Sequence, residues 1–225
     1  MAAPRGRVID LSHPIREGMT TYPGLPGPEF GDHLTREEAE GAYGQGITFH
    51  IGRISMVGNT GTYLDSPFHR CPHATDLAGL DLPRLVDVEG LVVRAAASGD
   101  RAVDVAHLEG HEVAAKAVLV HTGWDHHWGT EAYGRDNPYL TESATAWLVE
   151  RAPALVGIDS VNIDDIGDRR RPAHSGLLAA GIPIVEHLCG LDRLPDHGFR
   201  FHAAPPAVEA FGTFPVRAYA VLPGP

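Results

Sequence analysis

Three short apolar runs in the second half of the chain place the strongest constraint on its fold. Residues 117–121, 154–158 and 182–185 consist mainly of Ala, Val, Leu and Ile. Apolar runs this short are typical of strands that are buried on both faces of a parallel sheet. The sequence therefore predicts three neighbouring buried strands.

Helical segments separate these runs. Thr141 is a suitable N-cap, and Glu142 places a negative charge in the first turn of the helix that follows. A second, shorter helix is expected over about residues 175–180, where Gly181 and Pro183 end it. Strands that alternate with helices, joined by right-handed crossovers, predict a parallel α/β arrangement.

Acidic residues follow two of the runs directly. Asp159 comes after residues 154–158, and Glu186 comes after residues 182–185. Binding sites in open α/β sheets form beyond the carboxyl ends of the strands. We therefore expect Asp159 and Glu186 at the functional edge of the sheet.

The first half of the chain is richer in strand signals. Residues 8–11 and 91–95 are short apolar segments, and residues 46–58 alternate loosely, which predicts a half-buried strand with one irregularity. No repeat or linker divides the sequence, and its length suits one domain. We expect a single domain over residues 1–225.

Composition narrows the class of partner. The net charge of −11 disfavours nucleic acid, and the only short basic run, residues 169–171, is expected to be a solvated loop. No apolar run is long enough to cross a membrane, and residues 1–14 do not resemble a signal peptide. Two isolated cysteines fit a reducing compartment. We expect a cytoplasmic protein that acts on a small molecule, with no nucleic-acid or membrane partner.

The segment most informative about chemistry is residues 58–69, G-N-T-G-T-Y-L-D-S-P-F-H. Gly61 permits a tight backbone path, and Pro67 restricts the chain just after Asp65. Asp65 and His69 are thus expected on a stiff turn. A catalytic carboxylate and imidazole need such a support, because small misplacements weaken catalysis steeply.

This segment resembles the signature of the cyclase family, H-x-G-T-H-x-D-x-P-x-H. The likeness continues in order over nearly the whole chain, through residues 9–15, 22–24, 120–124, 156–160, 163–164, 174–186 and 214–218. The resemblance implies the family's swivelling β/β/α-type fold, an α/β class with a mixed sheet and parallel strand–helix units in the second half. It also implies a homodimer or homotetramer.

The resemblance further implies an activity and a site. Family members hydrolyse N-formylkynurenine, open cyclic amides or close polyketide rings. We therefore expect an enzyme that acts at a carbonyl of a small aromatic or polyketide-like molecule, with kynurenine formamidase activity as the narrower hypothesis. His69 matches the family's general acid/base, Asp65, His174 and Glu186 match its metal ligands, and Tyr22 matches a substrate-facing aromatic residue.

Two positions depart from the family signature. Asn59 and Tyr63 stand where relatives carry metal-binding histidines, and neither is a good zinc ligand. Asp65, His174 and Glu186 remain. One imidazole and two carboxylates suit a single divalent ion such as Zn or Mn, with one coordination position left open.

The same departures leave a metal-free site as an alternative. Without a cation, the like charges of Asp65 and Glu186 would raise the pKa of one carboxyl group, which becomes a proton donor while the other stays a base. Tyr63 would donate to a developing oxyanion, and Asn59 would hold a carbonyl or hydroxyl group of the substrate. Such a site suits cyclisation, dehydration or isomerisation in secondary metabolism. A third alternative is a catalytically inert homologue that binds a small molecule.

Overall fold

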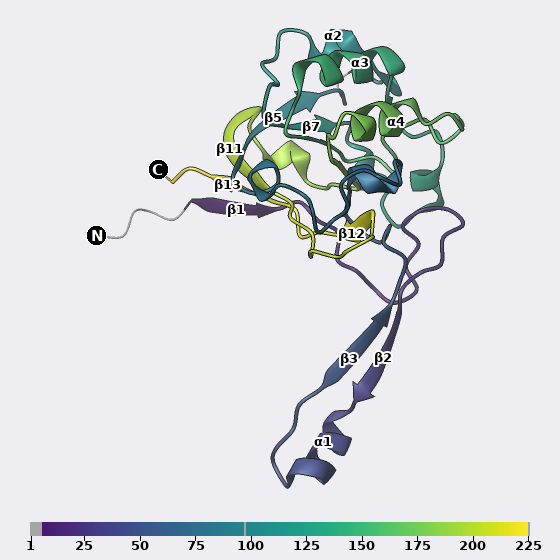
Figure 1. The fold of residues 1–225 in the computed structure, drawn as a ribbon, viewed down its shortest axis with the longest axis vertical. Helices are drawn as coiled ribbons and strands as arrows, with labels where there is room; N and C mark the ends of the chain where they lie inside the picture. Colours follow the sequence, from purple (N-terminus) through teal and green to yellow (C-terminus); the bar gives the residue numbers. More distant parts are fainter. Residues whose placement is uncertain (1–5, 97, 225) are drawn as a thin grey trace.

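The computed structural model describes residues 6–96 and 98–224. Within them, nine strands form one mixed sheet through the body of the molecule (Figure 1). In spatial order the strands are β1 (Arg7–Asp10), β13 (Tyr219–Leu222), β11 (His197–His202), β5 (Val88–Arg94), β7 (Ala117–His121), β9 (Leu155–Ile158), β10 (Ile184–Glu186), β4 (Tyr63–Asp65) and β12 (Thr213–Pro215). The predicted α/β class with a mixed sheet is confirmed.

The centre of the sheet is formed by parallel strands. β5, β7, β9 and β10 run parallel, and the register places Val118 beside Val156 and Val156 beside Ile184. Successive strand residues point to opposite faces. Leu119 accordingly packs into one core cluster, whereas Val118 and Val120 pack into another. Both faces of the central strands are buried, as their continuous apolar sequences predict.

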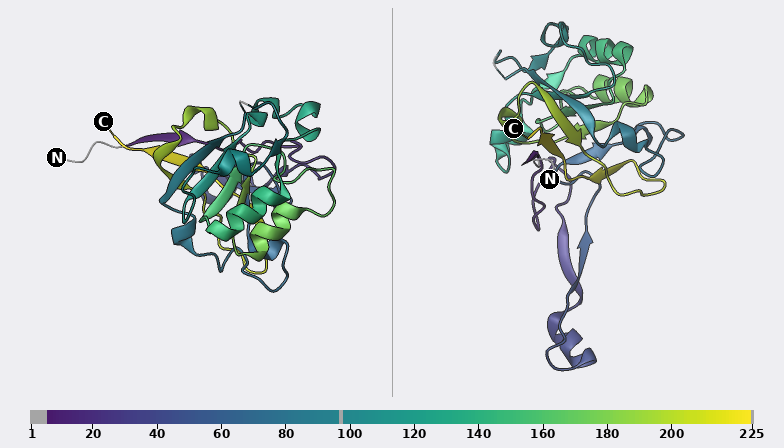
Figure 2. Two further views of the ribbon diagram at one scale, coloured as in Figure 1. Left: turned by 90° about the horizontal axis from the view of Figure 1, so that it is seen from above. Right: turned by 90° about the vertical axis from the view of Figure 1, so that its left-hand side faces the viewer.

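Helices cover one face of this sheet (Figure 2). They are α2 (Val105–Leu108), α3 (Glu142–Arg151) and α4 (Pro172–Ala179). The predicted start of α3 is confirmed, because Oγ1 of Thr141 accepts a hydrogen bond of 3.1 Å from the backbone N–H of Ala144.

The start of α4 differs from the expected position near Ser175. The helix begins at Pro172, where the fixed proline φ angle suits the first helical position. Its first free N–H groups donate to the carboxylate of Asp164, which lies outside the helix. A cap supplied from a separate loop leaves no signal in the helix sequence itself.

One segment projects away from the body as an arm (Figure 1). It consists of β2 (Glu29–Leu34) and β3 (Ile51–Ser55), which pair antiparallel, and of α1 (Arg36–Tyr43) at the far end. The expectation of a half-buried strand within residues 46–58 is wrong, because every residue of β3 is exposed. Loose alternation of apolar residues indicates a strand but does not identify the surface that would cover it.

The remaining elements are short. β6 (Ala102–Val103) pairs with β8 (Tyr139–Leu140). Single 3₁₀ turns occur at η1 (Pro67–His69), η2 (Leu82–Arg84), η3 (Trp124–His127), η4 (Glu131–Gly134) and η5 (Leu191–Arg193). Among the described helices, none is both long enough and apolar enough to cross a membrane.

The ring of Phe199 in β11 packs directly against β5 because Gly90 has no side chain. An added Cβ atom there would lie 2.0 Å from Cε2 of Phe199. We predict that Gly90→Ala lowers the free energy of unfolding by about 1–3 kcal/mol, the usual cost of overpacking, as measured by urea denaturation. Gly41→Ala is the control, because an added Cβ atom there meets nothing within 4 Å. Equal stabilities of the two variants would contradict this packing.

Candidate functional site

Asp65 is held at the end of β4 between two neighbouring strands. Its register partners are Ile184 of β10 and Thr213 of β12. The side chain is fully buried, and its Oδ2 atom has no hydrogen-bond partner. Because an unpaired buried oxygen is energetically costly, Oδ2 marks a position where a cation or a donor group would be stabilising.

His69 ends the 3₁₀ turn that begins at Pro67, directly after β4. Its Nδ1 atom lies 2.8 Å from Oγ1 of Thr213 and 3.5 Å from Oδ1 of Asp65. The Thr213 hydroxyl also hydrogen-bonds Oδ1 of Asp65. A carboxylate only accepts, so the hydroxyl donates to Asp65 and accepts from Nδ1–H of His69. In the neutral ring, this arrangement leaves Nε2 as the basic nitrogen.

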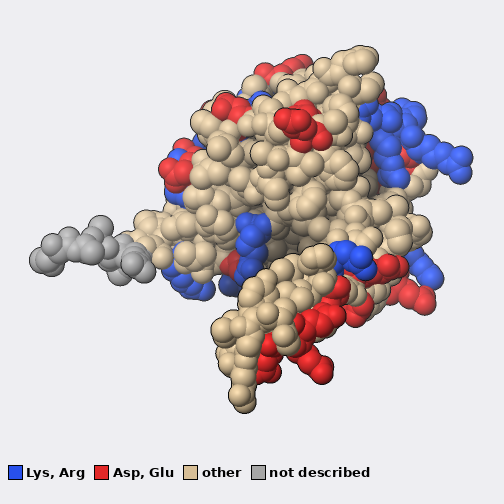
Figure 3. Space-filling view, turned by 60° about the horizontal axis from the view of Figure 1, so that its bottom comes forward, with Lys and Arg blue, Asp and Glu red and all other residues tan. Residues whose placement is uncertain are grey.

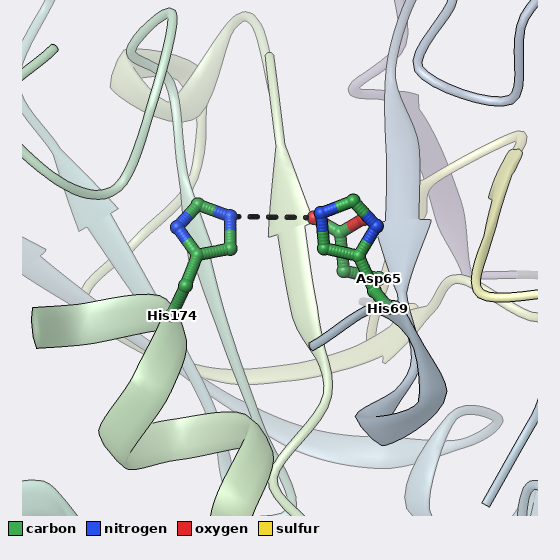
Figure 4. A group of neighbouring side chains, drawn as sticks. All are labelled: Asp65, His69 and His174. Atoms are coloured by element: carbon green, nitrogen blue, oxygen red, sulfur yellow. Dashed lines mark ion pairs between the residues drawn. The ribbon is translucent and has the colours of Figure 1, made fainter. Parts of the chain in front are cut away.

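His174 approaches from α4, opposite Asp65 and His69 (Figure 4). Its Nδ1 atom lies 2.6 Å from Oδ2 of Asp164. The Asp164 carboxylate also accepts from the backbone N–H groups of Ala173 and His174, at 2.6 and 3.1 Å. One carboxylate thus caps the helix and fixes the ring, so that Nε2 of His174 faces Oδ2 of Asp65 at 3.6 Å.

Glu186 ends β10 and is also fully buried. Its Oε2 atom accepts a hydrogen bond of 2.6 Å from the Tyr63 hydroxyl, and its Oε1 atom accepts one of 2.6 Å from the backbone N–H of Ile163. Oε1 also lies 3.6 Å from Nε2 of His174. The Tyr63 hydroxyl is therefore committed to Glu186 in this structure, whereas the expected metal-free role would require it to face a substrate oxyanion.

Three carboxylates, those of Asp65, Asp164 and Glu186, surround the imidazole of His174. Burial alone would lower the pKa of His174, but the carboxylates raise it to about 10. Burial raises the pKa of Glu186 to about 7 against the opposing effect of His174. Burial also acts to raise the pKa of Asp65, but the neighbouring imidazoles of His174 and His69 outweigh it, so that the pKa is lowered. The cluster requires a positive charge, either an imidazolium or a bound cation.

The cluster opens into a pocket of about 310 Å³, at the small end of the range for ligand sites. Tyr22, Asn59 and Tyr63, the expected substrate-binding residues, all line it. The full lining is Tyr22, Leu25, Asn59, Tyr63, His69, Arg70, Asn162, Arg171, His174 and Glu186. The side chains expected from separate parts of the sequence therefore meet in one place, and their catalytic and binding roles stay predictions.

Arg171 is a pocket residue that the sequence did not reveal. The expectation of a solvated loop over residues 169–171 is wrong at this position, because Arg171 is half-buried. Its Nη2 atom donates to the Tyr22 hydroxyl at 3.0 Å, and its Nη1 atom donates to Oδ1 of Asn162 at 3.3 Å. The arginine thereby fixes the ring of Tyr22 at the pocket wall.

Asp159 does not reach the pocket, contrary to the expectation that it lies at the functional edge. Its carboxylate accepts hydrogen bonds from the backbone N–H groups of Thr122 and Gly123, at 2.8 and 2.9 Å. Burial raises the pKa of Asp159 to about 7. The residue stabilises the turn after β7, so the two strand-end carboxylates, Asp159 and Glu186, have different positions despite similar sequence contexts.

The donor set fits one divalent cation. Asp65, His69 and His174 each offer a ligand atom, and these atoms lie within 4.8 Å of one another. Oδ2 of Asp65 is unpaired, and the second nitrogen of His174 is held by a carboxylate, as is usual for metal-binding histidines. Glu186, expected as the third ligand, adds an oxygen at 3.6 Å from His174.

Comparisons with solved structures show the fold. An isatin hydrolase bound to the product analogue thioisatinate aligns with a TM-score of 0.84 at 21% identity, covering 98% of this chain and 94% of that chain. A potential metal-dependent hydrolase with cyclase activity aligns with a TM-score of 0.80 at 23% identity, covering 97% and 99%. The architecture is therefore that of the cyclase and metal-dependent hydrolase structures.

Sequence comparison gives the family. The family model for putative cyclases matches residues 9–165. The kynurenine formamidase of Bacillus cereus is 28% identical over 216 residues, which cover 93% of this chain and 95% of the relative. That of Bacillus thuringiensis subsp. konkukian is 27% identical with the same coverage. The chain belongs to the putative cyclase family and, as a member, is an enzyme of the hydrolase or cyclase class.

Substitution of Asp164 tests whether this carboxylate positions the ring of His174 for metal binding. We predict that Asp164→Asn weakens binding of Zn²⁺ or Mn²⁺ about 10–100-fold, the usual effect of removing a carboxylate behind a histidine ligand. Calorimetric titration of each metal into the protein measures this change. Asp168→Asn, in the exposed loop before α4, is the matched control. Unchanged affinity in Asp164→Asn would contradict the assigned role of Asp164.

Proposed function

We propose that this enzyme hydrolyses the amide bond of a small aromatic formamide or cyclic amide in the pocket between β4, β10 and α4. One observation carries the proposal: Oδ2 of Asp65, buried and unpaired, faces Nε2 of His174, and the imidazole of His69 lies alongside with its ring centroid 5.9 Å from that of His174. The named activities of the relatives, kynurenine formamidase and isatin hydrolase, support an amide bond as the target.

His69 has the geometry of a general acid/base. Thr213 holds its Nδ1–H, and Thr213 is itself fixed by Asp65. In the neutral ring, Nε2 of His69 is free to take a proton from the attacking water as the water oxygen bonds to the carbonyl carbon. The same proton then passes to the amide nitrogen as the C–N bond breaks. The products are a carboxylic acid and an amine.

Of the side chains that could hold a divalent cation, we assign Asp65, His174 and Glu186 as its ligands and leave His69 for proton transfer. When bound, such an ion polarises a carbonyl group and makes water more acidic. The chain's own contribution is orientation: Asp164 fixes the ring of His174, and Tyr63 and the backbone of Ile163 fix Glu186. Donors held this rigidly need no rearrangement during the reaction.

Other residues that line the pocket suit a substrate with an aromatic ring. Tyr22 is held by a hydrogen bond from Arg171, and Leu25 adds an apolar surface. Arg70 and Arg171 place positive charge beside the pocket, which suits a product carboxylate. The small volume limits the substrate to about one or two rings.

A second candidate is metal-free proton-transfer chemistry, such as cyclisation or dehydration. One observation favours it: the raised pKa of His174 makes this residue an imidazolium that already balances the surrounding carboxylates. The Tyr63 hydroxyl likewise satisfies Glu186 without a cation. Asn59 then remains at the pocket wall to bind a substrate carbonyl.

Turnover measurements separate these functions. The purified enzyme is assayed with N-formylkynurenine and with isatin, after removal of metal by a chelator and after addition of Zn²⁺ or Mn²⁺. We predict metal-stimulated hydrolysis, and a fall in kcat of about 10²–10⁴-fold in His69→Ala, the usual contribution of a general acid/base. His73→Ala, with its exposed imidazole nearby in the sequence, is the matched control.

Each other outcome identifies an alternative. Absence of hydrolysis with either substrate under every metal condition would refute amide hydrolysis. Equal kcat values for His69→Ala and His73→Ala would refute the role of His69. A chain that binds an aromatic amide with unchanged affinity in His69→Ala but never turns it over is an inert binding homologue.

A further inference from the structure

Behind the candidate site, the side chains of Tyr133, His187 and Tyr63 form a continuous hydrogen-bonded chain that ends at Glu186. The Tyr133 hydroxyl lies 2.9 Å from Nδ1 of His187, and Nε2 of His187 lies 3.3 Å from the Tyr63 hydroxyl. The Tyr63 hydroxyl in turn lies 2.6 Å from Oε2 of Glu186. Of these four residues, Tyr63 and Glu186 line the pocket, and the other two lie behind them.

The direction of each hydrogen bond in this chain is determined by the next one. A carboxylate only accepts, so the Tyr63 hydroxyl donates its single hydrogen to Glu186, and the Tyr63 oxygen accepts from Nε2–H of His187. Burial lowers the pKa of His187 to about 3, so the ring is neutral and carries one N–H group. Nδ1 of His187 is therefore an acceptor, and the Tyr133 hydroxyl donates to it. Every donor in the chain points toward Glu186.

The backbone and a neighbouring ring hold His187 in place. Its φ angle is +57°, a left-handed conformation that a residue other than glycine keeps only where the surrounding structure enforces it. Oγ1 of Thr62 donates to the His187 carbonyl oxygen at 2.6 Å. Trp128 packs edge-on against both Tyr133 and His187, with ring centroids 5.0 and 5.6 Å away. The imidazole is therefore rigidly placed between the two hydroxyl groups.

The burial of Glu186 explains why such a chain is needed. Acidic side chains along the arm of β2, α1 and β3 are exposed to solvent (Figure 3), whereas Glu186 is fully buried and depends on hydrogen-bond donors. The register of β4 and β10 places Tyr63 directly opposite Glu186. A polar chain in the interior is costly unless every member is satisfied, and apolar side chains would fill the same space without that requirement. The chain is thus better explained by its effect on Glu186 than by packing.

We propose that His187 and Tyr133 are positioning residues that act through Tyr63 on the carboxylate of Glu186. The inference rests on the proposed function, in which Glu186 is a metal ligand. Because Tyr63 holds Oε2 of Glu186, the other oxygen, Oε1, is left to face Nε2 of His174 at 3.6 Å. The N–H group of His187 occupies the Tyr63 oxygen and so commits the Tyr63 hydrogen to Glu186, while Tyr133 determines which nitrogen of His187 carries that N–H.

Imidazole ¹⁵N NMR of the purified full-length chain tests the direction of the hydrogen bonds. The His187 signals are assigned by their absence in a His187 variant. We expect the hydrogen of His187 on Nε2, and a downfield shift of the Nδ1 signal in Tyr133→Phe, where Nδ1 loses its donor. Tyr219→Phe is the matched control, because this half-buried tyrosine stacks on His202 instead, and it is expected to leave both signals unchanged. A hydrogen on Nδ1 of His187 would overturn the proposal.

Two substitutions at position 187 separate positioning from packing. The amide of Gln reaches about as far as Nε2 of the imidazole and still donates to Tyr63, whereas the shorter amide of Asn reaches only as far as Nδ1. We expect His187→Asn to weaken binding of Zn²⁺ or Mn²⁺ about tenfold, the lower end of the usual effect of residues behind a ligand, and His187→Gln to stay within about threefold of the unaltered chain. Calorimetric titration measures both affinities.

The two variants distinguish this inference from the proposed function. Both remove the same buried ring, so a merely structural role of His187 would weaken metal binding equally in the two. Equal affinities in His187→Asn and His187→Gln, with metal binding intact in the unaltered chain, would refute this inference alone. An unaltered chain that binds neither ion would refute the proposed metal role of Glu186 and this inference with it. Circular dichroism verifies that every variant is folded.

Discussion

The charge balance around His174 is the constraint on which the site depends. Asp65 and Glu186 are each fully buried in the cluster, and Asp164 contacts the same imidazole. Buried carboxylates are stable only when paired or hydrogen-bonded. The surrounding structure meets this need with donors on every side: Thr213 for Asp65, the start of α4 for Asp164, and Tyr63 and Ile163 for Glu186. Oδ2 of Asp65 is the oxygen left without a donor.

The sheet creates this constraint by bringing distant strands together. β4 is antiparallel to β10 and pairs with β12, so Asp65 and Glu186 lie on adjacent strands although 121 positions separate them in the chain. The apolar core beneath keeps water from the carboxylates and strengthens each electrostatic interaction. Stability and chemistry are therefore linked, because the same rigid strands that bury the charges also fix the geometry of the proposed reaction.

The parts of this arrangement with local signals could be predicted from sequence. The apolar run at residues 117–121 and the cap at Thr141 gave a strand and a helix where the structure has them. The turn at residues 58–69 identified Asp65 and His69, and its family likeness pointed to His174 and Glu186. The hydrogen bonds from Thr213 and Asp164 could not be predicted, because they join residues far apart and depend on the final packing. The exposure of β3 could not be predicted either, because an alternating apolar sequence is compatible both with a buried strand and with an exposed one.

The most direct test of the account is whether a metal ion replaces the proton on His174. Calorimetric titration of Zn²⁺ or Mn²⁺ near neutral pH, in two buffers of different ionisation enthalpy, measures both the ion stoichiometry and the protons released. The account predicts one ion per chain, with proton release, because Nε2 of His174 must lose its proton to become a ligand. Absence of binding, or binding without proton release, would contradict it.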